Sequence, residues 1–355
     1  MFHPRLDTST NADNLLALRE KLESRGYESP MLDLRLDFNE ESQVLTQYLK
    51  HVYVPDAKKQ PERVHAHFLP TQANGRWSVT NPPLINFPED IRDVLIPDKG
   101  FPWVCWDWDS LYALFCAAYT HDKEDLEAFR LGHDIHTIAA CRMLKIPLPP
   151  DLSDPHQSPT CAEWREKYHW KGKVDKRRTM AKVRYALLFG KDWTAVKGSK
   201  YERDWVKGGH GTKPEFWNAA KLFLANKPGM VSARLKWFDR LAKAGVATTI
   251  MGRKRRLFGD YWTRAKDGWN HLFQGLEPDL LNTSLIELCS SGRWMLVYPS
   301  HDGAKISVPE VDLVDPTTLA RFKDVVERKL TIEGEEITCR ATWQIYHPDG
   351  SKEHV

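Results

Sequence analysis

Two short apolar runs limit what this chain can fold into, because each of them ends in an aspartate at a turn. The first is WVCWDWD, residues 103–109, and the second lies in WMLVYPSHDG, residues 294–303. Both runs are typical of buried strands, whereas helical periodicity dominates from about residue 161 to 244. This order predicts one sheet-based platform with a long helical lobe inserted into it.

Composition places the chain among ordinary globular proteins. Its 355 residues, 41% of them hydrophobic, are enough to bury one large core or two to three smaller ones. It has no apolar run of membrane-spanning length, its start does not resemble a secretion signal, and its six cysteines show no paired spacing. We therefore expect a cytoplasmic protein with no membrane partner, located in the nucleoid or, if a phage encodes it, in the host cytoplasm.

Positive charge is concentrated in two places although the net charge is only +3. Residues 165–184 contain nine Lys or Arg and two acidic residues, with aromatic residues between them, and residues 253–256 form a second basic cluster. This pattern indicates a surface facing nucleic acid or nucleotides. A solvated basic helix face is the alternative.

The strand-end aspartates are the first candidates for chemistry. If the two strands are neighbours, Asp302 meets either Asp107 or Asp109 at one edge of a sheet. Paired carboxylates beside phosphate oxygens suit Mg²⁺, and two such ions can activate a hydroxyl and stabilise a leaving oxygen. The alternative is that Asp302 only caps a hairpin turn, where aspartate is common.

A third candidate is a basic and aromatic helix within KRRTMAKVRYALLFG. Arg178, Lys182, Tyr185 and Phe189 are spaced four, three and four residues apart, which keeps them on one helical face. Cations there suit a triphosphate, and the aromatic rings suit a base. An amphipathic helix with basic residues extended into solvent is the alternative.

In this order, the three stretches resemble the polymerase domain of family A DNA polymerases, the DNA polymerase I group. WDWDSLYALFCAAYTHD resembles motif A, KRRTMAKVRYALLFG resembles motif B and PSHDGAKISVPE resembles motif C. The connecting segments agree, among them NGRWSVTNPPLINFP, GHDIHT, GVATTIMGRKRRL and WNHLFQGLEPDL. The resemblance covers roughly residues 60–315.

The resemblance implies an α/β chain of the α+β type, with a right-hand palm built on an antiparallel sheet and a helical fingers insertion. The expected domains are a reduced thumb or N-terminal helical region (1–62), first palm part (63–130), fingers (131–250) and second palm part (251–355). We expect no exonuclease domain. With so short a thumb region, either the chain is a minimal polymerase of poor processivity, or a second protein supplies the thumb, exonuclease or processivity function.

The implied function is template-directed DNA synthesis, with primer–template DNA and dNTPs as partners and two Mg²⁺ ions as cofactors. In the family, the motif A aspartate precedes a second aspartate by fifteen positions. Asp107 has this spacing to Asp122, whereas Asp109 does not, so the resemblance assigns the metal to Asp107. Asp302 would be the second metal ligand.

The resemblance also implies roles for the other site residues. Lys182 would act in catalysis by protonating the pyrophosphate and would bind the triphosphate together with Arg178. The incoming nucleotide would further meet Tyr185, Phe189 and Tyr112. The DNA contacts would be Arg76, Lys266, Asn270 and Gln274 on the primer–template and His301 at the primer end.

The sequence departs from the family pattern at three points. Tyr112 stands where motif A has a glutamate that blocks the ribose 2′-hydroxyl, and Gly303 replaces a motif C glutamate. Motif B is one residue shorter between its lysine and its aromatic residue. Two alternatives therefore stay open: a catalytically weak, polymerase-like subunit that binds nucleic acid, or a primer-making polymerase that uses NTPs.

Overall fold

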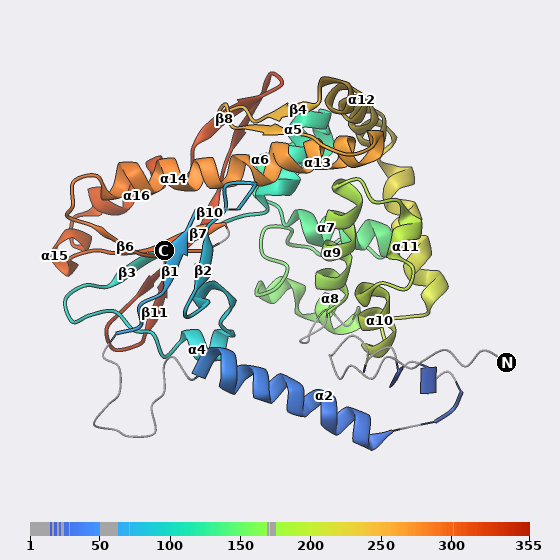
Figure 1. Cartoon of the computed structure of the whole chain (residues 1–355), viewed down its shortest axis with the longest axis horizontal. Coiled ribbons are helices and arrows are strands. Elements are labelled where there is room, and N and C mark those ends of the chain that lie inside the picture. Colours follow the sequence, from blue (N-terminus) through green and yellow to red (C-terminus); the bar gives the residue numbers. More distant parts are fainter. Residues whose placement is uncertain are drawn as a thin grey trace. The chain divides into compact units, whose positions relative to one another are not determined.

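The structure is a computed structural model that describes residues 29–49, 63–70, 72–168, 170, 175–300 and 302–355, with isolated positions between 15 and 27. The chain divides into two compact units. In Figure 1 the colours follow the sequence, from blue at the N-terminus to red at the C-terminus. Unit 1 comprises residues 1–70 and 77–96, and unit 2 comprises residues 71–76 and 97–355.

Unit 1 contains a small antiparallel hairpin and one long helix. β1 (His67–Leu69) pairs with β2 (Ser78–Thr80). The helical elements are α2 (Pro30–Gln43), the π-helix η1 (Val44–Leu49), the 3₁₀ turn η3 (Leu84–Asn86) and α4 (Glu89–Arg92). Residues 1–14 and 50–62 lie outside the described residues, so the reduced thumb proposed for 1–62 stays a prediction.

The main sheet of unit 2 has five antiparallel strands in the order β11-β10-β3-β7-β6. The hairpin predicted around residue 302 is formed by β6 and β7. The strands are β3 (Trp103–Trp108), β6 (Met295–Pro299), β7 (Gly303–Ser307), β10 (Ala341–Tyr346) and β11 (Lys352–His354).

One face of this sheet packs against the helices α14 (Leu276–Cys289) and α16 (Pro316–Val326), which contact each other (Figure 1). The indole N–H of Trp108 donates a 3.0 Å hydrogen bond to the Val326 carbonyl oxygen in α16. Because side chains alternate along a strand, Asp107 points to the opposite face from Trp108.

The helical insertion between β3 and β6 begins with α5 and ends at α14. Its helices include α5 (Leu111–Thr120), α6 (Lys123–Arg130), α7 (Ile135–Leu144), α8 (Ala162–Lys167), α9 (Lys176–Leu188), α10 (Lys200–Lys207), α11 (Lys213–Asn226), α12 (Pro228–Ala244) and α13 (Tyr261–Gln274). Two 3₁₀ turns, η4 (Pro159–Cys161) and η5 (Trp193–Val196), lie among them. The Asp, Ser or Thr before several helices accepts a backbone N–H, which fixes where each helix starts: Asp122, Asp134, Asp175, Ser199, Thr212 and Asp260.

An aromatic core joins the helices that lie behind the candidate site. Tyr119 of α5 contacts Trp237 of α12 and both Trp269 and Phe273 of α13, with ring centroids 5.3–6.2 Å apart. The Trp269 indole N–H donates a 2.9 Å hydrogen bond to the Leu188 carbonyl oxygen. This bond ties the end of α9 to the core and so fixes the aromatic residues of α9.

The remaining strands form two small hairpins, β4 (Val246–Thr248) with β5 (Lys254–Arg256) and β8 (Lys329–Ile332) with β9 (Glu335–Thr338). Helix α16 ends at Val326, because the chain then enters β8. A short helix, α15 (Glu310–Leu313), precedes α16. Across the part of the chain that the structure describes, no helix has the length and apolarity needed to cross a bilayer.

Candidate active site

The two strand-end aspartates lie at the same edge of the main sheet. Asp107 is in β3, and its Cα pairs with that of Gly303 at the start of β7. Asp302 directly precedes Gly303, and its carbonyl oxygen accepts a 2.8 Å hydrogen bond from the Trp108 N–H. Asp107 is exposed and Asp302 is half-buried. The two carboxylates were expected to converge only if their strands are neighbours. In the main sheet, β3 and β7 are neighbours.

Gly303 allows β7 to approach β3 closely beside these aspartates. A Cβ at this position would lie 1.9 Å from the Trp106 carbonyl oxygen and 3.1 Å from the Asp107 Cα. Both atoms belong to the backbone, so no rotation of a side chain relieves the clash. The strand spacing therefore requires glycine at the position where the family pattern has a glutamate.

Glu277, the second residue of α14, is a buried carboxylate near this edge. Its side chain is 0% exposed. Its Oε2 accepts hydrogen bonds from Arg76 Nε (3.1 Å) and Nη2 (2.6 Å), and from the Tyr112 hydroxyl. Burial raises the pKa of Glu277 to about 8; the Arg76 charge opposes the rise and the Asp302 charge adds to it. Its hydrogen bond with Tyr112 ties Glu277 to the start of α5, the helix that follows β3 and Asp107.

Tyr112, in the first turn of α5, packs against an aromatic pair from α9. Its ring centroid lies 5.6 Å from that of Phe189 and 6.4 Å from that of Tyr185, both in edge-to-face geometry. Tyr185 and Phe189 stack on each other with centroids 6.2 Å apart. Burial raises the pKa of Tyr185, and the charge of Asp302 contributes to the rise. The three rings therefore form one aromatic wall beside Asp302.

His136 of α7 links this wall to the start of α5. Its Nε2 lies 2.8 Å from the Ser110 hydroxyl and 3.2 Å from the Tyr185 hydroxyl. Burial lowers the pKa of His136 to about 3, and the nearby charges of Arg184 and Arg177 lower it further. The ring is therefore neutral at physiological pH, and it connects three helices through hydroxyl groups.

The cations predicted to hold the triphosphate lie on the outer side of α9. The side chains of Arg178 and Lys182 are exposed. Their neighbour Arg177 instead binds Asp134 through two hydrogen bonds, from Nε at 2.7 Å and from Nη2 at 2.8 Å. Arg177 is thus the cation of α9 that is fixed by an ion pair to the start of α7.

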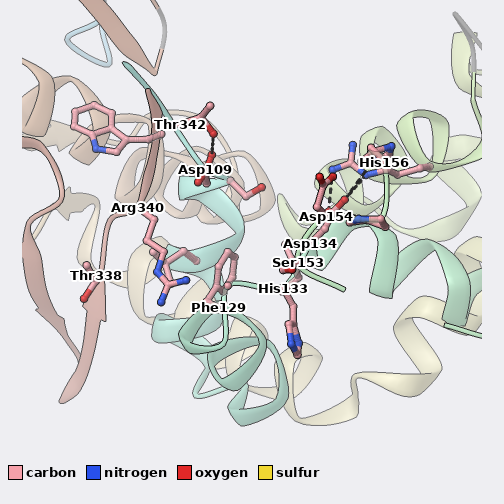
Figure 2. A pocket seen from close by; sticks show the side chains of 17 residues that line it. Asp109, Phe129, His133, Asp134, Ser153, Asp154, His156, Thr338, Arg340 and Thr342 are labelled. Atoms are coloured by element: carbon pink, nitrogen blue, oxygen red, sulfur yellow. Dashed lines mark hydrogen bonds and ion pairs between the residues drawn. The ribbon is translucent and has the colours of Figure 1, made fainter. Parts of the chain in front are cut away.

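A cavity of about 370 Å³ is lined by Asp109, the second aspartate of motif A. Figure 2 shows Asp109 and Thr342 on one side of it, and Asp134 and His156 on the other. The Thr342 hydroxyl donates a 2.9 Å hydrogen bond to Asp109, and burial raises the pKa of Asp109. Burial alone would also raise the pKa of Asp134, but hydrogen bonds from His156 and Arg177 hold it well below its usual range. Asp109 thus interacts with β10 on a side of motif A that Asp302 does not line.

The residues predicted to contact DNA differ in their exposure and in whether they are paired with an acidic residue. Lys266, Asn270 and Gln274 follow each other at intervals of four along α13, where Lys266 is exposed and the other two are half-buried. Arg76 is paired with Glu277, as described above. His301 lies outside the described residues.

The basic cluster at residues 253–256 is partly neutralised by acidic neighbours. Arg253 Nε donates a 2.8 Å hydrogen bond to Asp279, and Arg255 lies 3.2 Å from Asp267. These two arginines therefore stabilise the packing of β5 against α13 and α14, and the cluster is not a free basic patch.

A second acidic group, formed by Asp122, Glu124 and Asp125, lies at the start of α6, and we call it the Lys227 cluster. Lys227 Nζ lies 2.8, 3.1 and 2.7 Å from the three carboxylates, respectively. Burial alone would raise the pKa of Asp125, but the charges of Arg184 and Lys227 outweigh it and lower the pKa. The position where these carboxylates converge is therefore already taken by an ammonium group.

Asp107 and Asp302 are the better fit for divalent metal ions. They supply hard oxygen ligands from two adjacent backbone segments, which is the ligand type that Mg²⁺ prefers. In the part of the chain that the structure describes, no ion pair is seen for the Asp302 carboxylate, in contrast to the Lys227 cluster.

Comparison with known proteins identifies the family. The sequence profile of DNA polymerase family A matches residues 4–312, which is most of the chain. The chain belongs to DNA polymerase family A. Among curated relatives, it is 24% identical over 342 residues to the thermostable DNA polymerase I of Thermus thermophilus and 21% identical over 345 residues to DNA polymerase I of Lactococcus lactis.

These family A relatives are much longer proteins. The alignments cover 88% and 91% of this chain but only 35% and 36% of the two relatives, so the chain spans about a third of their length. Among solved structures, the fold is similar to the POL domain of Pol1 from M. smegmatis in complex with DNA primer-template and dNTP, with a TM-score of 0.67 and 18% identity. That alignment covers 97% of this chain and 57% of the other. The predicted polymerase fold, a mixed helix and antiparallel-sheet architecture, is confirmed.

Two residues of the candidate site, Glu277 and His136, were not predicted from the sequence. Glu277 lies in WNHLFQGLEPDL and His136 in GHDIHT, two segments that carried the resemblance without a role for either residue. A buried carboxylate in an apolar helix start was the available signal for Glu277. Arg177 and Arg178 are adjacent in the sequence, so the sequence alone does not indicate that Arg177 is the one that lines the cavity.

Proposed function

We propose that this chain is a template-directed DNA polymerase, which adds dNTPs to a primer 3′-hydroxyl and releases pyrophosphate. The observation that carries the proposal is the meeting of Asp107 and Asp302 at one sheet edge, beside the aromatic wall of Tyr112, Tyr185 and Phe189. Membership of family A supports the reaction class. We further propose the palm (63–130 and 251–355) and fingers (131–250) as its working parts.

In the proposed reaction, the primer 3′-oxygen forms a bond to the α-phosphorus, and the bond from that phosphorus to the pyrophosphate oxygen breaks. Asp107 and Asp302 would hold two Mg²⁺ ions. When bound, these ions would lower the pKa of the primer hydroxyl and stabilise the charge on the leaving oxygen. Most of the protein's contribution to such a transfer is positioning and charge stabilisation.

The other residues serve substrate binding in this proposal. Tyr185 and Phe189 offer ring faces beside which the base and sugar can lie, and the exposed Arg178 and Lys182 can meet the triphosphate as α9 moves. Lys182 would give its proton to the leaving pyrophosphate. Along α13, Lys266, Asn270 and Gln274 present donors to the primer–template, which positions the duplex without reading its sequence.

Primer extension tests the proposal directly. A labelled primer–template is incubated at low salt with Mg²⁺ and with dNTPs or NTPs in separate reactions, because phosphate contacts weaken as salt rises. The comparison is between the wild type, Asp302→Ala and a control, Asp324→Ala, which removes an exposed aspartate in α16. Extension by the wild type and the control, but not by Asp302→Ala, supports the proposal.

The opposite result has a definite meaning. If all three proteins bind the duplex equally and none extends the primer, the chain on its own is a nucleic-acid-binding subunit. A third result is that the chain extends the primer only when a second protein supplies thumb or processivity function. The reaction class would then be right, but the chain would not act as a polymerase on its own.

A further inference from the structure

Glu277 makes specific polar contacts inside the protein core. A carboxylate with no exposure is costly to bury unless its oxygens are hydrogen-bonded. Here Oε2 receives three donors, two from Arg76 and one from Tyr112, which lie 201 and 165 residues away in sequence. No hydrogen-bond partner for Oε1 is found among the described residues. The buried group thus serves chiefly to bring two distant side chains together.

The Tyr112 ring is held on several sides by these contacts. The Arg76 guanidinium carbon lies 5.6 Å from its centroid, in the geometry of a cation over an aromatic ring. Phe189 and Tyr185 approach it from α9 at 5.6 and 6.4 Å, and its hydroxyl is bound to Glu277. The ring is only half-buried, so part of its surface stays open to a substrate.

A ring fixed in this way cannot swing aside for a larger substrate. Packed protein interiors give way little, and each contact around the ring would have to break for it to turn. Tyr112 follows Asp107 by five residues, at the position where the family pattern has the glutamate that blocks the ribose 2′-hydroxyl, so on the proposed function it lies near the sugar of the incoming nucleotide. An added 2′-hydroxyl would then compete with the ring for the same space.

We propose that Glu277 is a positioning residue that locks Tyr112 against the nucleotide sugar, and that this lock makes the site select 2′-deoxynucleotides over ribonucleotides. The inference rests on the proposed polymerase function and deepens it. It assigns the sugar choice to a pair of residues on α5 and α14, with Arg76 completing the lock. The rival explanation is that Glu277 only anchors the 71–76 segment through Arg76.

The test is a mutant cycle on sugar selectivity. Single-nucleotide addition is measured with a dNTP and with the matching NTP, and kcat/KM is compared for the wild type, Glu277→Ala, Tyr112→Ala and the double variant. Glu277→Gln keeps the side-chain volume in case Glu277→Ala does not fold. Glu202→Gln is the matched control, because Glu202 is another buried glutamate, paired with Trp217 and Lys213 in the helical lobe.

The expected result is a fall of about tenfold in the dNTP-to-NTP ratio for Glu277→Ala, the size of one net hydrogen bond. The change should come mainly from a lower KM for the NTP, so that the KM ratio of the two nucleotides shifts more than their kcat ratio. Tyr112→Ala should lower the ratio by about tenfold or more, and adding Glu277→Ala to it should have no further effect. Glu202→Gln should keep the wild-type ratio.

Three results would overturn the inference. These are an unchanged ratio in Glu277→Ala and Glu277→Gln with activity retained, additive effects of the two substitutions in the double variant, or an equal loss of kcat for both nucleotides. The last two would indicate the anchoring role alone.

Failure of the proposed function gives a different pattern. The Kd of dNTP and NTP is also measured on a primer that ends in a dideoxynucleotide, so no chemistry is needed. If the wild type binds both nucleotides but never extends a primer, the proposed function fails. In that case, a changed ratio of the two Kd values in Glu277→Ala supports the inference, and an unchanged ratio overturns it.

Discussion

Two acidic groups in unit 2 use the same residue types for different purposes. In the Lys227 cluster, three carboxylates surround an ammonium group that the chain itself provides, and Arg184 adds a second cation at 2.8 Å from Asp125. At the edge of the main sheet, Asp107 and Asp302 come from two neighbouring strands and lie beside a third carboxyl, Glu277, whose pKa is raised.

The difference shows how to tell a structural acidic cluster from a candidate metal site. A cluster that is charge-balanced by buried lysine and arginine has no need for an external cation, and it stabilises the fold. At the sheet edge, the charge of Asp302 contributes to the raised pKa of Glu277, and a bound cation would relieve such repulsion between carboxylates. On this ground the strand-end pair, and not the Lys227 cluster, is where added Mg²⁺ is expected to act.

The largest expected effect is on catalysis at the strand-end pair. Asp107→Asn should reduce primer extension on the order of a thousandfold or more, because metal-assisted charge stabilisation contributes several kcal/mol to such reactions. Thermal unfolding should show no loss of stability, since one of two like charges is removed. Single-turnover extension and calorimetry measure the two effects, and activity within about tenfold of wild type would contradict the metal assignment.

The Lys227 cluster should respond in the opposite way. Lys227→Ala should lower the free energy of unfolding by roughly 3 kcal/mol, because it leaves poorly solvated carboxylates without their cation. Extension per folded molecule should stay near wild type. The matched control is Lys243→Ala, which removes an exposed lysine paired with Asp239 four residues earlier and should cost less than about 1 kcal/mol. Urea unfolding compares the two, and equal losses would show that the cluster is not structural.

A further expected effect, spread over several pH units, is the pH dependence of stability at Glu277. The folded pKa, about 8, lies above the ordinary value of 4.5, so between these values the native state keeps a proton that the unfolded chain releases. The wild type should therefore lose stability as pH rises from 5 to 8, relative to Glu277→Gln, by at most about 1.4 kcal/mol per pH unit. Urea unfolding at several pH values measures the slope, and a difference independent of pH would refute the raised pKa.

The smallest effect is expected at Asp109. In Asp109→Asn the side-chain oxygen can still accept the hydrogen bond from Thr342, and the substitution removes a charge that burial disfavours. Primer extension should stay within about threefold of wild type. A loss comparable to that of Asp107→Asn would reverse the choice between the two motif A aspartates.

The parts of the fold that depend on local pattern could be predicted from the sequence. The apolar run ending at Asp107, the hairpin around Asp302 and the helix that carries Tyr185 each follow from spacing and turn residues within a few positions. The order of the three stretches then indicated the family. Helix ends were less predictable: the helix at 316 stops at Val326 because the following residues pair as a strand, which local propensity does not determine.

The site was harder to predict where it depends on contacts between distant residues. Arg76 was expected at the primer–template, yet its guanidinium is bound to Glu277, and neither residue carries a local signal of the other. In α9, no local pattern distinguishes Arg177 from Arg178 as the partner of Asp134. The roles of these residues in binding DNA and nucleotides remain predictions.

The close approach of β7 to β3 at Gly303 also limits how this protein can change by mutation. Any residue other than glycine at 303 meets backbone atoms of Trp106, so the glutamate of the family pattern is not accommodated here by that substitution alone. It would need a compensating shift of β3, the strand that carries Asp107. New acidic chemistry beside Asp302 is therefore more accessible through substitutions on other elements, such as the start of α14, than through motif C itself.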